Sequence, residues 1–372
     1  MKKVLILGAG NAQIDAIEYC HEHGIFVAGC SYTTTDAGIP LLDAFEQVDI
    51  KNAAGVADLA ERLEVDAIYS VGSDLAIPSI MEASERLSLP HFVSPETAET
   101  CHSKHLMRQA LGPDFKGNLN FIVCETLEKA LCFNQFPAMM KPVDSQGQRG
   151  CFRVDSEEDI REHFDVSLGY SVSGRVIIEE YVDGPEISVN GYFQGGEMRF
   201  AIVSDRHVFD EYPGGIIKEH VIPSVYTDAL SEAEAIDLTR RTAEALGITD
   251  GPCYAQIKLG QDGHPRMLEI APRLDGCHMW NLIKHYCGAD LLDACFTHLL
   301  TDEAVLTDSY PMPDEPLLLT FMSMETGKVF DRALFDTEDA EYVKWYYETG
   351  DTVRKLNGYI EKCGYMIRRE EQ

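Results

Sequence analysis

Residues 253–273 read CYAQIKLGQDGHPRMLEIAPR, two largely apolar segments on either side of a polar stretch that contains Asp262-Gly263. Asp-Gly is a favoured two-residue turn between antiparallel strands, so we expect a β-hairpin here. Counting outward from that turn places Gln256 opposite Glu269, with their Cβ atoms about 5 Å apart. Two oxygen-bearing side chains at this separation suit a shared hard cation such as Mg²⁺. An ordinary cross-strand polar pair would have the same spacing, and a three-residue turn would shift the register and break the inference.

The segment before this hairpin, VIIEEYVDGPEISVNGYF (176–193), predicts two strands joined by an Asp-Gly turn. In the second strand, alternation separates the apolar Ile187 and Val189 from a polar face that begins at Glu186. An exposed edge strand is an equally good interpretation of this face. Arg273, just beyond the hairpin, is placed to neutralise a bound carboxylate or a developing oxyanion.

A second glycine-containing stretch, KPVDSQGQRG, occupies residues 141–150. Its loop offers backbone N–H groups without bulky apolar side chains, which suits a fold over phosphate oxygens. A plain hairpin turn is the alternative. Lys141 favours the phosphate interpretation, because a lysine at the end of an apolar strand is otherwise disfavoured.

The first 97 residues alternate apolar strand segments with amphipathic helical ones, a pattern that predicts a doubly wound parallel sheet. The expected strands are 3–8, 25–30, 66–72 and 91–93, and the expected helices are 11–24 (with Asn11 as N-cap), 53–65 and 77–90. The GAGNAQ stretch at the first turn lacks a third glycine, and no acidic residue ends the second strand. Both absences argue against a dinucleotide site.

The rest of the chain predicts a small α+β unit at about 114–180, followed by an antiparallel set of strands. The small unit has expected strands at 120–124, 137–143, 150–154 and 175–182 and a helix at 156–164. The antiparallel set has expected strands at 186–193, 198–205, 253–260 and 265–272, a helix at 231–247, and further strands within 311–372. Ser94-Pro95 and Ser103 are expected to start two helices, the second of which carries Lys104.

Charge and composition narrow the class of protein. The 372 residues include 31 basic and 62 acidic side chains, a net charge of −31 that disfavours binding to nucleic acid. No apolar run is long enough to cross a membrane. The 11 cysteines form no CxxC pair, which is typical of reduced cysteine in a cytoplasmic protein.

Taken together, the lysines, the glycine-containing loop, the double-acid strand end and the hairpin ending in EIAPR resemble the ATP-grasp superfamily. The likeness is to its carboxylate–amine ligases and carbamoyl-phosphate-synthetase-like proteins, and it covers nearly the whole chain. It implies an α/β plus α+β architecture of three parts. These are a doubly wound N-terminal domain (1–97), an ATP-grasp domain (98–310) with a lid at about 114–180, and a segment (311–372) that completes the C-terminal lobe.

The resemblance also implies a role for each matching position. Phosphate contacts fall to Lys104, Lys141 and the loop residues Ser145, Gln146, Gly147 and Gly150. Adenine and ribose contacts fall to Glu179, Glu180, Tyr181, Val182 and Glu186. Gln256 and Glu269 are the implied metal ligands. Arg273 and Lys141 are the implied catalytic residues for the step that forms the acyl phosphate.

Two positions depart from the family pattern. Many members have an acid where this chain has Gln256, although glutamine occurs in the carbamoyl-phosphate-synthetase branch. Many have asparagine where this chain has Ala271, so a second ion would lack one ligand. The expected cofactors are therefore ATP and one or two Mg²⁺ ions, with Mn²⁺ as an alternative.

The resulting expectation is an ADP-forming ligase that joins a small carboxylate to an amine, with no nucleic-acid or membrane partner. A homodimer stays open, because family members are often dimers. Three other functions also stay open: carboxyphosphate chemistry with bicarbonate, nucleotide binding without catalysis, and NAD-dependent oxidoreduction.

Overall fold

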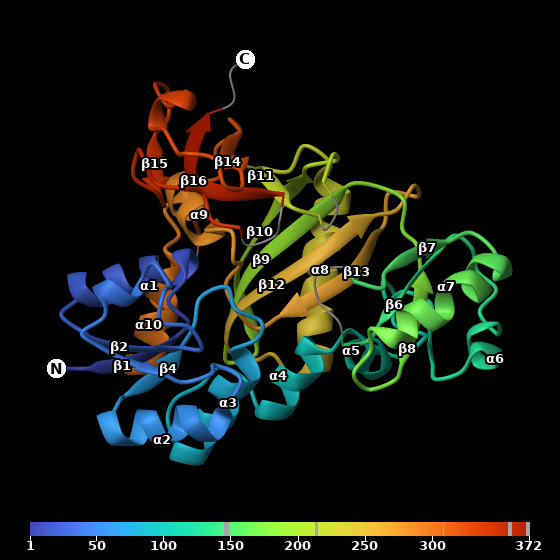
Figure 1. Ribbon diagram of the computed structural model, residues 1–372, viewed down its shortest axis with the longest axis horizontal. Coiled ribbons are helices and arrows are strands. Elements are labelled where there is room, and N and C mark those ends of the chain that lie inside the picture. The colour runs from blue at the N-terminus through green and yellow to red at the C-terminus, as the bar shows by residue number, and fades with distance from the viewer. Residues whose placement is uncertain (145–148, 213–214, 308, 356–358, 370–372) are drawn as a thin grey trace.

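The computed structural model describes residues 1–144, 149–212, 215–307, 309–355 and 359–369. Three sheets organise these residues, and Figure 1 shows them side by side: an N-terminal parallel sheet, a small sheet at the opposite end, and a long antiparallel sheet beside both. No helix among the described residues combines the length and the apolar character needed to cross a bilayer.

The N-terminal sheet is parallel, with strand order β3-β2-β1-β4. Its strands are β1 (Lys3–Leu7), β2 (Phe26–Ser31), β3 (Ala44–Gln47) and β4 (Ala67–Tyr69), joined through α1 (Asn11–Glu22), the short helix η1 (Ile39–Leu41), α2 (Ala53–Leu63) and α3 (Ile77–Leu87). Helix α1 lies on one side of the sheet and α2 and α3 on the other (Figure 1). Strands covered on both faces read as continuous apolar runs, as in Val4–Leu7 of β1, which are fully buried. The expected doubly wound arrangement is confirmed.

The small sheet is antiparallel, with order β5-β8-β6-β7. It consists of β5 (Phe121–Cys124), β6 (Ala138–Pro142), β7 (Phe152–Val154) and β8 (Val176–Glu180), covered by α6 (Leu127–Ala130) and α7 (Glu157–Gly169). Its apolar side chains form a core of their own, apart from the main core that joins the N-terminal domain to the large sheet. This unit, named the lid below, coincides with the small α+β unit expected at about 114–180, and its movement as a lid stays a prediction.

The large sheet is antiparallel and has eight strands in the order β13-β12-β9-β10-β11-β14-β16-β15. The strands are β9 (Glu186–Gln194), β10 (Glu197–Val208), β11 (Ile217–Ile222), β12 (Gly251–Leu259), β13 (Pro265–Ala271), β14 (Leu317–Glu325), β15 (Tyr342–Trp345) and β16 (Ile360–Arg369). Helices α4 (Pro95–His102), α5 (Lys104–Leu111), α8 (Ala229–Leu246), α9 (Met279–Cys287), α10 (Leu291–Thr301) and the short helix η2 (Arg332–Leu334) complete the chain. The last three strands extend this sheet, so the C-terminal segment adds no sheet of its own.

The hairpin of β12 and β13 has the expected Gln256–Glu269 pairing, but its turn differs from the expected one. Near the tip Leu259 pairs with Pro265, which excludes a two-residue turn at Asp262-Gly263. The register then shifts between Gln256 and Ile257, leaving one extra residue on β13, and this β-bulge restores the pairing. The longer turn and the bulge therefore cancel.

Several local expectations were wrong. Residues 91–93 form no strand, so the N-terminal sheet ends at β4. The N-cap of α1 is Gly10, and Asn11 is the first helical residue. Ser94 caps α4 as expected, by accepting a hydrogen bond from the Thr97 N–H, whereas the Ser103 side chain makes no capping bond to α5. Strands β3 and β11 and helices α9 and α10 had not been anticipated.

Candidate active site

Lys104 and Glu269 form an ion pair between the start of α5 and strand β13. Attraction to the Lys104 ammonium is the largest influence on Glu269 and, against the effect of burial, holds the pKa of that carboxyl at about 2. Glu269 is therefore ionised at neutral pH. The Lys104 side chain keeps 40% exposure, so this residue lies at an open part of the site.

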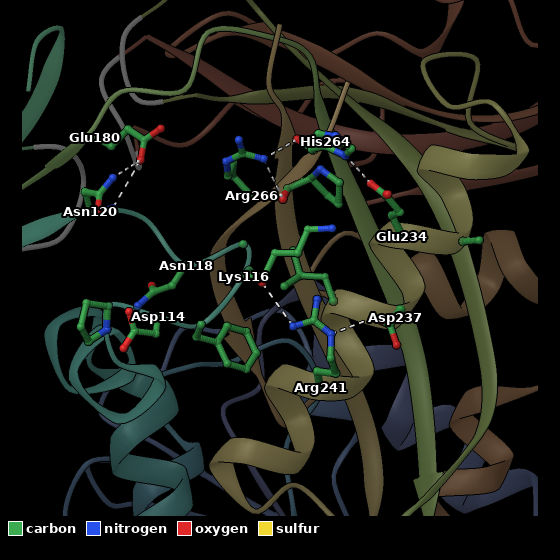
Figure 2. A pocket seen from close by; sticks show the side chains of 16 residues that line it. Asp114, Lys116, Asn118, Asn120, Glu180, Glu234, Asp237, Arg241, His264 and Arg266 are labelled. Atoms are coloured by element: carbon green, nitrogen blue, oxygen red, sulfur yellow. Dashed lines mark hydrogen bonds and ion pairs between the residues drawn. The ribbon is translucent and has the colours of Figure 1, made fainter. Parts of the chain in front are cut away.

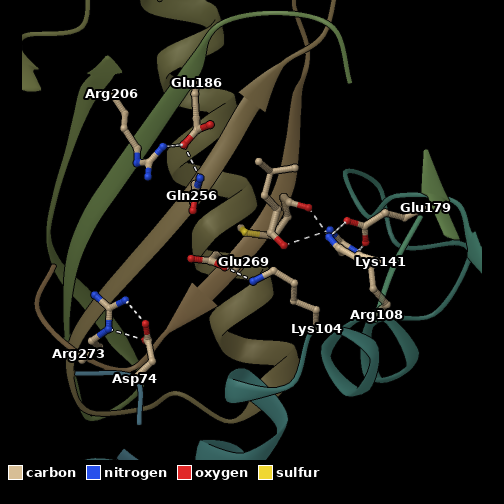
Figure 3. Close-up of polar contacts among 12 residues, drawn as sticks. Asp74, Lys104, Arg108, Lys141, Glu179, Glu186, Arg206, Gln256, Glu269 and Arg273 are labelled. Carbon is tan, nitrogen blue, oxygen red and sulfur yellow. Dashed lines mark hydrogen bonds and ion pairs between the residues drawn. The ribbon is translucent and has the colours of Figure 1, made fainter. Parts of the chain in front are cut away.

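Lys141, at the end of lid strand β6, pairs with Glu179 on the neighbouring strand β8. Burial favours the neutral acid, but the Lys141 and Arg108 cations outweigh it and hold the pKa of Glu179 at about 2. Both predicted lysines thus lie between the large sheet and the lid, each held by a carboxylate (Figure 3).

Arg108 is a central residue that sequence analysis missed. Its side chain is fully buried and donates to the Met267 carbonyl at 2.7 Å and to the Leu268 carbonyl at 3.1 Å, at the bulge of β13. Its Nε lies 3.4 Å from the Glu179 carboxylate. The available signal was its position four residues after Lys104, which places both cations on one face of α5.

Glu186 begins β9 and accepts hydrogen bonds from two neighbours, the Arg206 guanidinium and the Gln256 side-chain amide. Because the side-chain nitrogen of Gln256 faces Glu186, the side-chain oxygen of Gln256 remains available as a ligand for a cation. Gln256 and Glu269 are direct cross-strand partners. An ionised carboxylate beside an amide oxygen fits one Mg²⁺ ion whose remaining ligands are phosphate oxygens and water. Ala271 offers no such oxygen.

Arg273 is held by the N-terminal domain. Its Nε and a terminal nitrogen contact the two carboxylate oxygens of Asp74 at 2.6 and 2.7 Å. The Arg273 side chain is buried, and its guanidinium also lies 5.2 Å from the centre of the Tyr254 ring. The backbones of the N-terminal domain and of the segment after β13 approach closely at this point. A Cβ added to Gly72 would lie 2.4 Å from the Gly276 Cα.

The remaining predicted residues surround the junction of lid and large sheet. Ser145, Gln146 and Gly147 lie outside the described residues, whereas Gly150 is buried with a φ of +71°. Glu180 reaches the Asn120 amide at 3.3 Å, the Tyr181 N–H donates to the Pro137 carbonyl, and Val182 is buried. Their contacts with a nucleotide stay predictions.

A hollow of about 530 Å³ lies behind this junction, between residues 113–118, helix α8 and the tip of the hairpin (Figure 2). Its two arginines are already paired: Arg241 with Asp237, and Arg266 with Asp262 of the adjoining turn. The lysines of the site do not line it. The Lys104–Lys141 region is therefore the candidate site, and its chemistry stays a prediction.

Comparisons with known proteins identify a domain family for part of this chain. Residues 134–280 match the family model of the ATP-grasp domain. Carnosine synthase 1 of Mus musculus is 25% identical over 326 residues, which cover 78% of this chain and 39% of that protein. The chain spans between 39% and 58% of the length of the curated relatives that it matches over most of its own length.

Two solved structures share the whole architecture. The L-amino acid ligase of Bacillus licheniformis has a TM-score of 0.79 at 17% identity, over 100% of this chain and 94% of that chain. The second is the biotin carboxylase domain dimer of Hydrogenobacter thermophilus 2-oxoglutarate carboxylase, in complex with MgADP, ADP and bicarbonate. It has a TM-score of 0.80 at 15% identity, over 99% of this chain and 86% of that chain. The chain has the ATP-grasp fold, and its residues 134–280 match the ATP-grasp domain model, which confirms the resemblance drawn from its sequence.

Proposed function

We propose that this protein is an ADP-forming ligase that joins a small carboxylate to an amine through an acyl phosphate. The observation that carries the proposal is the pair of lysines, Lys104 from α5 and Lys141 from the lid, which converge on one region of an ATP-grasp domain. The names of the carnosine synthase and the L-amino acid ligase support a carboxylate and an amine as substrate classes.

The nucleotide would lie between the lid and the large sheet. Lys104 and Lys141 each have a carboxylate partner, and an ATP phosphate entering the site would compete for the same ammonium groups. Tyr181 and Val182 follow the last strand of the lid sheet, which supports a role for their backbone in holding adenine. Glu186, already a double acceptor, would receive the ribose hydroxyls.

Glu269 and Gln256 would hold Mg²⁺, which when bound neutralises charge on the transferred phosphoryl group. We propose one ion, because Ala271 supplies no further ligand; Mn²⁺ has the same preference for oxygen. A carboxylate oxygen of the first substrate attacks the γ-phosphorus, and ADP leaves. The amine then attacks the acyl carbon and inorganic phosphate leaves, with the amine proton passing to solvent.

Arg273 would stabilise the acyl phosphate once its contact with Asp74 is exchanged for the substrate. The lid, with its separate core, would close over the intermediate and exclude the water that hydrolyses it. We further propose a cytoplasmic enzyme, supported by eleven free cysteines. A homodimer is proposed by analogy with the biotin carboxylase domain dimer.

Release of ADP and phosphate tests this function. The purified chain would be supplied with Mg²⁺ and ATP, and with amino acids singly and in pairs. Release that requires one particular pair would support amide formation and identify the substrates. Release with bicarbonate alone would instead favour carboxyphosphate chemistry. Measurable ATP binding without release under any condition would contradict the ligase.

A further inference from the structure

A group of metal-binding side chains, none of which has been assigned a role above, lies next to Arg273: Asp275 Oδ1 is 3.9 Å from a terminal nitrogen of Arg273. His220 belongs to β11, whereas Asp275 and Cys277 belong to the segment between β13 and α9. One donor atom from each lies within 4.8 Å of the other two, and His220 Nε2 is 3.7 Å from Asp275 Oδ2. Among the described residues, no other group of at least three His, Cys, Asp or Glu side chains meets this distance.

The donor atoms are buried and largely without partners. His220 is 0% exposed, Asp275 5% and Cys277 7%. Neither ring nitrogen of His220 has a hydrogen-bond partner, and Asp275 Oδ2 has none either. Buried polar groups in folded proteins are normally paired, so atoms left unpaired and facing one another indicate a missing ligand.

The local backbone explains why these side chains meet. His220 pairs with Arg206 across strands β10 and β11, which places the imidazole on the same face of the sheet as the Arg206 guanidinium. Gly276 stands between the other two donors and packs on the N-terminal domain, where an added Cβ would lie 3.0 Å from the Gly72 carbonyl oxygen. The segment that carries Asp275 and Cys277 is thus held against the N-terminal domain on one side, and its donor atoms lie near His220 of β11.

We propose that His220, Asp275 and Cys277 bind one transition-metal ion of the Zn²⁺ class. Imidazole nitrogen and thiolate sulfur favour such ions over Mg²⁺, which prefers oxygen ligands. Nitrogen and oxygen ligands of a tetrahedral Zn²⁺ ion, at about 2.0–2.2 Å from the metal, lie about 3.3–3.6 Å apart, so the 3.7 Å between His220 and Asp275 would need to close only slightly. Three protein ligands leave a fourth position for water or another small ligand.

The charges of the neighbourhood are compatible with a dication. Asp275 and the Cys277 thiolate together supply two negative charges, and the thiol proton passes to solvent when the ion binds. The Lys362 ammonium, 3.7 Å from Cys277 Sγ, is placed to donate to the bound sulfur, an outer contact common around metal ligands. Two further cations are nearby: Arg206 is paired with Glu186, and Arg273, 3.9 Å from Asp275, is paired with Asp74.

The site shares no ligand with the Gln256–Glu269 pair, although Asp275 lies 3.9 Å from Arg273, and its metal binding does not rest on the proposed ligase reaction. Its test is therefore a binding measurement. The full-length chain, treated with a chelator under reducing conditions, would be titrated with Co²⁺ in excess Mg²⁺, which fills oxygen-rich sites. We expect one equivalent of Co²⁺ to bind and to produce a thiolate-to-cobalt charge-transfer band.

Three variants separate this site from adventitious binding. Cys277→Ser is expected to abolish the charge-transfer band, and His220→Gln to weaken Co²⁺ binding at least about tenfold. Cys132→Ser, which removes an exposed thiol, is the matched control and should leave the band unchanged. Circular dichroism would establish that each variant is folded. If His220→Gln does not fold, the result for the near-isosteric Cys277→Ser variant decides the test. Absence of the band in the unmodified chain, or an equal band in Cys277→Ser, would overturn the proposal.

Discussion

Replacement of Arg108 by methionine tests how the candidate site is held together. Methionine retains an unbranched apolar stem but removes the donors to the Met267 and Leu268 carbonyls and the contact with Glu179. Breaking a buried charge pair by removing one partner costs about 3–5 kcal/mol. Because Lys141 still faces Glu179, we expect a loss near the lower end, about 3 kcal/mol of unfolding free energy.

Two measurements would detect this loss. Urea unfolding should give a lower midpoint, and hydrogen exchange should show lost protection concentrated in α5, β8 and β13, the elements that Arg108 joins. Arg86→Met is the matched control, because Arg86 forms an exposed pair with Asp58 at 2.9 Å. Such surface pairs contribute about 0–1 kcal/mol. The reasoning would be refuted if Arg108→Met were no less stable than the control.

Three further changes probe the same framework. Lys141→Met should weaken ATP binding about tenfold or more, since a hydrogen bond to a charged group contributes about 1.5–3 kcal/mol; an unchanged Kd by calorimetry would contradict its phosphate role. The pKa of Glu179, about 2 in the folded chain against 4.5 for a free glutamate, predicts stability that is complete above pH 4.5 and lost as the pH falls toward 2. Glu179→Gln should flatten acid unfolding in that window, and an identical pH profile would exclude the assigned contribution. Gly72→Ala should destabilise the chain well beyond Gly24→Ala, because both residues have positive φ but only Gly72 has a backbone atom within 2.4 Å of an added Cβ; equal melting temperatures would contradict this.

Periodicity and turn chemistry were sufficient to predict most of the fold. The apolar runs of the N-terminal strands and the alternating strands around Glu186 identified the parallel and antiparallel sheets before any tertiary contact was known. The prediction of a strand at 91–93 was wrong because a segment of three residues is too short to specify a strand. The Gln256–Glu269 pairing was correct although its turn was wrong, since a bulge in β13 cancels the longer turn.

The contacts that hold the site were harder to predict because they join distant segments. Arg273 and Asp74 are 199 residues apart, and nothing in the local pattern of either segment indicates the other. His220 meets Cys277 only because β11 enters the large sheet, and this strand was missed. Arg108 is different: its spacing from Lys104 was visible, but a lone arginine in an amphipathic helix is usually solvent-exposed.

The most direct test of the central claim is the release of ADP from Mg²⁺-ATP in the presence of amino acids, singly and in pairs, with bicarbonate as a control. The ligase account predicts that ADP and phosphate appear in equal amounts, together with an amide product, only when a particular carboxylate and amine are both present. The same release should be lost in Lys141→Met. ADP release that needs no amine, or that persists unchanged in Lys141→Met, would contradict it.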